Sequence, residues 1–68
     1  MKLSARNILK GTVVEITTGA VNAIVRIDIG GAVITSSITN AAVEKLGLKV
    51  GEPGYAVIKA SDVMVGRD

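Results

Sequence analysis

Two short clusters of hydrogen-bond donors are the chemically most suggestive features of this sequence. Ser4-Ala5-Arg6-Asn7 places a hydroxyl, a guanidinium and an amide close together, and Lys59-Ala60-Ser61 sets an ammonium next to a hydroxyl. The Arg guanidinium is a planar fork of charged donors, which suits the geometry of an oxyanion. Brought together by the fold, the two clusters would hold a small anion. Arg6 and Lys59 could also be ordinary solvated surface residues, as most Arg and Lys residues are.

A third group of donors, Ser37-Ile38-Thr39, precedes a segment that favours a helix. Free N–H groups and the helix dipole at such a start attract negative charge. Thr39 could equally be a plain N-cap, whose hydroxyl bonds only the first turn of the helix. The sequence leaves both roles of Thr39 open. Asn7 and Asn22 are expected to bond their own backbone at turns or strand ends.

The residue types present exclude most catalytic chemistry. There is no His and no Cys, so the usual nucleophile–base pairs and zinc sites are absent. The glycines are not spaced as nucleotide-phosphate motifs, and Tyr55 is the only aromatic residue on which a base could stack. The six carboxylates are scattered and form no catalytic motif: Glu15, Asp28, Glu44, Glu52, Asp62 and Asp68. We therefore expect a binding protein with no enzymatic activity, no directly coordinated metal, no organic cofactor and no nucleic-acid partner.

The composition predicts one small domain that associates with copies of itself. Residues 1–68 form a single domain in which 49% of the residues are hydrophobic, and the mean hydropathy is +0.50. A chain this short buries only about 60% of the surface that its unfolded state exposes, so part of its apolar surface is expected to lie against another copy. Eight Lys and Arg against six Asp and Glu give a net charge of +2, too little for a polyanion-binding surface.

The expected location follows from the absence of membrane and export signals. No apolar run approaches the roughly 18 residues that cross a bilayer. The first residues lack the apolar stretch of a signal peptide. We therefore expect a cytoplasmic protein with no membrane partner.

Apolar periodicity predicts a mostly β chain with one short helix. Between Val21 and Ile29, alternate residues such as Val25 and Ile27 share one face, which is typical of a half-buried strand. The expected strands are 8–17, 21–29, 32–37, 55–59 and, after a bend, 61–65, with a helix between Thr39 and Gly47. This order of elements in so short a chain predicts an all-β fold with one short helix, a five-stranded OB-like barrel.

Several segments together match a known pattern. They are Ser4-Ala5-Arg6-Asn7, the run from Val33 to Thr39 leading into Leu46-Gly47-Leu48, and Lys59-Ala60-Ser61 followed by Val63. In these segments, and over nearly the whole chain, the sequence resembles the molbindin, or Mop, family of small molybdate-binding domains. The resemblance implies an OB-like barrel that assembles into a hexamer, a trimer of dimers, with oxyanions held between subunits.

The resemblance also implies a set of oxyanion-binding residues. Carried over position by position, the donors of one chain would face those of a neighbour, and a helix-start hydroxyl would add a further contact. The residues concerned are Ser4, Ala5 and Arg6, then Lys59, Ala60 and Ser61 of the neighbouring chain, and Thr39. Regulator members of the family carry an additional hydroxyl in the helix where this chain has Ala42, so this chain has one hydrogen-bond donor fewer on the helix side of the implied site.

The function implied by the resemblance is the binding of molybdate or tungstate for intracellular storage, buffering or homeostasis. Without a DNA-binding or ATPase segment beside the module, binding itself is the expected activity. Two other classes of protein stay open: an OB-type oligonucleotide-binding module and a purely structural oligomerisation domain. Retention on single-stranded DNA would identify the first, and a stability unaffected by molybdate would identify the second.

Overall fold

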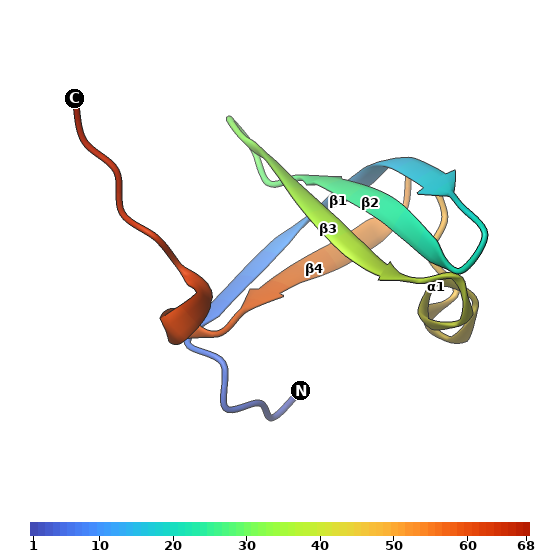
Figure 1. Cartoon of the computed structure of the whole chain (residues 1–68), viewed down its shortest axis with the longest axis horizontal. Coiled ribbons are helices and arrows are strands. Elements are labelled where there is room, and N and C mark those ends of the chain that lie inside the picture. The colour runs from blue at the N-terminus through green and yellow to red at the C-terminus, as the bar shows by residue number, and fades with distance from the viewer.

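Four strands, one short helix and a single 3-10 turn make up the computed structural model, which describes residues 1–68 (Figure 1). In chain order these are β1 (Asn7–Thr18), β2 (Asn22–Asp28), β3 (Val33–Thr39), α1 (Asn40–Leu46), β4 (Pro53–Ile58) and the 3-10 turn η1 (Ala60–Asp62). The strands form one antiparallel sheet in the order β3-β2-β1-β4. Strand β1 is therefore shared by both halves of the sheet.

The two halves of β1 serve different partners. Its first half, from Asn7 to Thr12, pairs with β4, and its second half pairs with β2. The change occurs next to a β-bulge at Val14, where the register with β2 shifts between Val13 and Glu15. Because a bulge adds one residue to one strand and increases its twist, it bends the sheet there. The sheet curls accordingly, as Figure 1 shows.

A small apolar core lies on the concave face of this curled sheet. Its buried members are Val13, Val25, Ile27 and Ala56, one or two from each of three strands. Half-buried residues surround them, among them Leu9, Ile16, Ile34, Ile38, Val43 and Leu48. The predicted alternation in the second strand is confirmed, since Val25 is buried and its neighbour Ile24 is exposed.

The helix has the limits that its capping residues predict. Thr39 is the N-cap, and Gly47 ends the helix with a left-handed backbone at φ 63°, which glycine adopts without steric cost. None of the seven residues of α1 is fully buried, although Val43 packs against the core. The helix thus links β3 to β4 and covers one end of the core.

The prediction of a fifth strand was wrong. Residues 60–62 form η1, in which the Asp62 N–H donates to the Lys59 carbonyl at 2.9 Å, and Val63 to Val65 are exposed without regular structure. Alternation of apolar residues predicts an extended segment but not whether it pairs with another strand, and here the turn of η1 intervenes between β4 and Val63. The closed five-stranded barrel is corrected accordingly to an open, curled, four-stranded sheet. Its edge strands, β3 and β4, do not pair with each other.

We expect Gly11→Ala to lower the free energy of unfolding by about 3 kcal/mol, the upper range for overpacking a close-packed site. Gly11 lies where β1 passes between β2 and β4, and an added methyl group would overlap the main-chain oxygen of Asp28. That oxygen belongs to the sheet and cannot rotate away. Urea unfolding at a fixed protein concentration measures the difference.

Gly66→Ala is the matched control, because nothing lies within 4 Å of the methyl group that it adds. It should leave the unfolding curve unchanged. Equal stability of the two variants would show that the close approach of β1 to β2 does not limit the fold.

Candidate functional site

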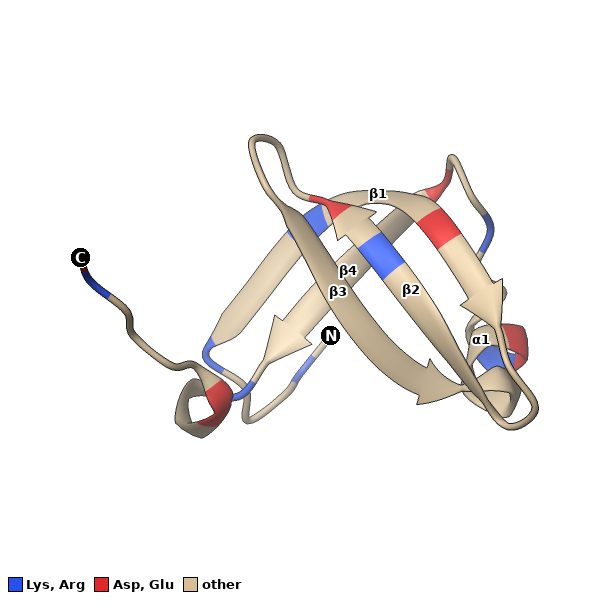
Figure 2. Ribbon diagram, turned by 45° about the horizontal axis from the view of Figure 1, so that its top comes forward, with Lys and Arg blue, Asp and Glu red and all other residues tan.

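The register of β1 against β4 brings the two predicted donor clusters to the same end of one chain. Asn7 and Ile58 form the last pair of this antiparallel ladder. Arg6 and Lys59 are the next residues of the two segments, one position beyond this pair, where Arg6 lies in a bend and the backbone of Lys59 is still extended at φ −65°, ψ 138°. Figure 2 shows basic segments just before β1 and just after β4. The sequence had not predicted that one chain would supply both clusters to one end.

Neither cation at this end has a carboxylate partner. The only ion pair in the chain joins Arg26 Nη1 to Glu15 Oε1 at 3.8 Å, across the β1–β2 pair. Arg6 and Lys59 are both exposed. Like charges on neighbouring strands repel one another, and this repulsion destabilises the pairing. An anion between the two side chains would remove the repulsion and accept hydrogen bonds from both.

The remaining members of the two clusters lie on segments that have just left the sheet. Ser4 and Ser61 are exposed, so their hydroxyls are free to reach a ligand. Ala5 and Ala60 can contribute only main-chain groups. Ala60 and Ser61 belong to η1, whose turn sends the chain away from the sheet directly after Lys59. The end of the molecule thus carries two cations and two hydroxyls on short arms outside the ladder, together with the carboxylate of Asp62 in η1.

Thr39 lies at the opposite end of the sheet. It pairs with Asn22 at the start of β2, beside the far end of β1. The eleven residue steps from Asn7 to Thr18 span up to about 36 Å of strand at the usual rise of about 3.3 Å per residue. The longest extent of the molecule is 35 Å. Arg6 and Thr39 of one chain therefore lie beside opposite ends of β1, which bends at its bulge between them.

The N-cap role of Thr39 is confirmed. Its Oγ1 accepts a hydrogen bond from the Ala42 N–H at 3.1 Å, and its backbone is extended at φ −71°, ψ 152°. Accepting this bond leaves the hydroxyl proton free, because a threonine hydroxyl can donate and accept at once. Thr39 can therefore cap the helix and still donate to a ligand from outside the chain.

Sequence reasoning missed the role of Asn7. Asn7 was expected to bond its own backbone. Instead, its Nδ2 donates to the Ile58 carbonyl at 3.2 Å, across the β1–β4 pair. The two residues are 51 positions apart, so no local pattern could have revealed the bond. The only usable signal is the adjacency of Asn7 to the donor cluster.

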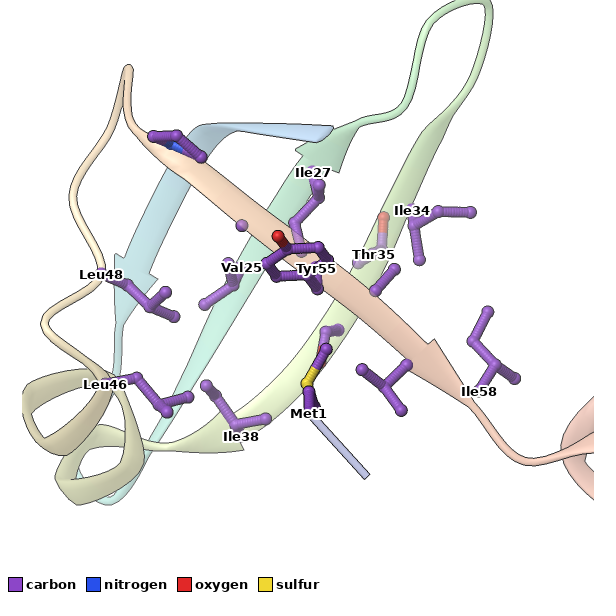
Figure 3. A pocket seen from close by; sticks show the side chains of 15 residues that line it. Met1, Val25, Ile27, Ile34, Thr35, Ile38, Leu46, Leu48, Tyr55 and Ile58 are labelled. Carbon is purple, nitrogen blue, oxygen red and sulfur yellow. The ribbon is translucent and has the colours of Figure 1, made fainter. Parts of the chain in front are cut away.

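An apolar pocket lies between the edge strands β3 and β4 (Figure 3). Its volume is about 660 Å³, and most of its lining residues are hydrophobic, among them Ile27, Ile34, Ile38, Leu46, Leu48 and Ile58. It offers few hydrogen-bond donors and none of the predicted anion-binding residues. The pocket is therefore unsuited to an oxyanion, and it marks where the sheet fails to close.

Comparison with known proteins identifies the class of this curled sheet and its donor-rich end. The TOBE domain model matches residues 3–65, so the chain belongs to the TOBE-domain family. Within that family it is a small Mop-type protein, a molbindin, as its relatives make plain. A probable molybdenum-pterin-binding protein of Haemophilus influenzae is 61% identical over 67 residues, which are 97% of each chain.

Solved structures agree with this assignment. A molybdate-binding protein from Sporomusa ovata superposes with a TM-score of 0.92 at 37% identity, covering 98% of this chain and all of the other. MopII from Clostridium pasteurianum gives 0.89 at 48% identity, covering 97% and 100%. The cytoplasmic molybdate-binding protein ModG, solved with molybdate bound, gives 0.88 at 57% identity, and the match covers 94% of this chain and 46% of ModG.

We expect Thr39→Ala to lower the free energy of unfolding by about 1 kcal/mol, the usual loss when an N-cap hydroxyl is removed. Thr39→Ser keeps the oxygen that accepts from Ala42 and should lose much less. Urea unfolding of both variants, at one protein concentration, measures the difference. If the serine variant lost as much stability as the alanine variant, the capping bond would not be the source of the loss.

Proposed function

We propose that this protein binds molybdate or tungstate between copies of itself and so stores or buffers the oxyanion in the cytoplasm, without catalysing a reaction. The observation that carries the proposal is the pair of cations at the end of the β1–β4 ladder. Arg6 and Lys59 stand next to each other without a carboxylate partner, and hydroxyls flank both. Repulsion between the two charges destabilises the anion-free protein, and a bound dianion would remove that repulsion and accept hydrogen bonds from both side chains.

The donor set accounts for selection among common anions. Molybdate and tungstate are tetrahedral dianions that accept hydrogen bonds at all four oxygens. Hydrogen phosphate carries a proton of its own, which would meet another donor and leave both groups unsatisfied. Sulfate has the same charge but shorter bonds, so a site sized for the larger ion would hold it with stretched hydrogen bonds.

The separation of Arg6 from Thr39 supports a site between subunits. The resemblance to the Mop family implies that both residues serve one oxyanion, and they lie at opposite ends of one chain. The resemblance implies that Lys59 comes from a neighbouring chain, whereas the register of β1 and β4 favours a different division, in which Arg6 and Lys59 of one copy meet Thr39 of another. An anion bound there links two chains, so ligand and assembly stabilise each other.

The exposed surface supports self-association. The chain exposes 5317 Å², whereas a folded monomer of its mass is expected to expose about 4,000 Å². Much of the excess is apolar: Met64 and Val65 are each 94% exposed, and the β3 and β4 edges flank an open apolar pocket. A second copy is the partner that such a surface fits best, and the family resemblance implies a hexamer built as a trimer of dimers.

The relatives support the identity of the ligand and the location. The structural neighbours from Sporomusa ovata and ModG are described as molybdate-binding, and ModG is described as cytoplasmic. None of the helices in this chain reaches the length and apolar character that crossing a membrane requires.

We expect saturable heat on calorimetric titration of the purified protein with molybdate, and little response to sulfate or phosphate at the same concentrations. Arg6→Ala or Lys59→Ala should each weaken molybdate binding about 10- to 100-fold, the factor for losing a hydrogen bond from a charged group. Both variants should keep the oligomeric state of the parent in size-exclusion chromatography with light scattering.

Lys10→Ala is the matched control, since it removes the same charge from an exposed position within β1, four residues along the chain from Arg6. It should bind molybdate like the parent. No heat with any oxyanion would refute the proposed function. Parental affinity in both Arg6→Ala and Lys59→Ala would refute the proposed site.

A mixing experiment tests whether the site lies between subunits. One variant carries Arg6→Ala with Lys59→Ala, and the other carries Thr39→Val, so each chain keeps only one of the two ends. After unfolding together and refolding, about one interface in four in a random 1:1 oligomer joins two intact ends. Binding at parental affinity should reappear at that fraction of sites. Its absence from the mixture would place all the ligands of a site in one chain.

A further inference from the structure

The ladder between β1 and β4 ends in an arrangement that is open to fraying. Asn7 and Ile58 are its last pair. On one side, residues 1–6 form no strand, and on the other side η1 begins one residue after Lys59. Terminal pairs with no further neighbours open more easily than central ones. The adjacent positive charges of Arg6 and Lys59 add a repulsion that favours opening.

The side chain of Asn7 opposes this opening. Its Nδ2 donates to the main-chain oxygen of Ile58 at 3.2 Å, in a partly buried position. It is the only side-chain hydrogen bond that joins β1 to β4. Through it, the residue that precedes Lys59 is tied to the residue that follows Arg6. The bond therefore fixes the two arms relative to each other at the point where they leave the sheet.

We infer that Asn7 is a positioning residue for the anion site: it holds Arg6 and Lys59 at a fixed separation and so sets the size of ion that they grip. This inference rests on the proposed function. Asn7 acts through the strand pairing: one N–H of its amide donates to Ile58, and the inference does not require the other N–H to touch the anion. Without the bond, the two arms move apart under their own repulsion and must be ordered again when an anion binds.

The inference predicts an effect on selectivity as well as on affinity. Arms held at a fixed separation favour the larger tetrahedral dianion and stretch the hydrogen bonds to a smaller one. Arms that are free to close fit sulfate and molybdate more equally. Loss of the Asn7 amide should therefore lower the ratio of molybdate affinity to sulfate affinity measured on the same protein. A mere loss of folded protein lowers both affinities together and leaves their ratio unchanged.

The test is titration of the parent and of Asn7→Ala with molybdate, with sulfate measured by competition. We expect molybdate affinity to fall about fivefold, the factor for one ordinary hydrogen bond, and the molybdate-to-sulfate ratio to fall with it. Ile16→Val is the control for stability, because Ile16 packs on the core from the other half of β1. It should lower the unfolding midpoint in urea while leaving the affinity and the ratio at parental values.

Hydrogen exchange of the anion-free proteins gives an independent measurement. In Asn7→Ala, amides of residues 5–9 and 56–60 should exchange faster than in the parent, with those of β2 and β3 unchanged. A parent that binds molybdate together with an Asn7→Ala variant of unchanged affinity ratio would overturn the positioning role alone. A parent that does not bind molybdate would overturn the proposed function, and the positioning role with it.

Discussion

The fold depends on one strand being shared between two partners. Strand β1 pairs with β4 through its first half and with β2 through its second, and the bulge at Val14 allows the change of direction between them. Gly11 makes the close approach possible, because any side chain there would overlap the backbone of β2. At one end this arrangement aligns Arg6 with Lys59, and at the other, through β2 and β3, it positions Thr39. The pairing of β1 thus determines where both halves of the candidate site lie.

Local features of the fold could be predicted from the sequence, whereas its pairings could not. Alternation identified the buried face of β2, and the capping residues identified α1, because both signals act within a few residues. The apolar residues Val63 and Val65 gave a similar alternation, yet they form no strand, because alternation within a segment does not determine whether that segment pairs with a strand edge. For the site, residue types and family resemblance suggested the donors. Only the register could bring Arg6 beside Lys59, and only the structure could reveal the bond from Asn7 to Ile58.

One mode of assembly would account for two unsatisfied surfaces of the molecule. Its polar end carries unpaired positive charge, and its open seam carries unpaired apolar surface and unpaired strand edges. The 33 main-chain hydrogen bonds, with five more from side chains, fall well short of the roughly one per residue that folded proteins contain. A second copy that covered the apolar surface and the strand edges would supply further hydrogen bonds. A bound anion would supply partners for the positive charges. At an anion concentration a hundred times Kd, each filled site would add about 2.7 kcal/mol to the stability of the assembly.

The distance in sequence between the two arms of the polar end has a consequence for biosynthesis. Strands β1, β2 and β3 form a meander of neighbouring hairpins, which can close while the chain is still being made. The pairing of Asn7 with Ile58 spans 51 residues, and such non-local pairing is the slow part of folding. Arg6 and Lys59 therefore meet only after nearly the whole chain has left the ribosome. For the proposed site, a nascent or truncated chain without β4 would lack one of the two donor clusters, so anion binding would await a complete subunit.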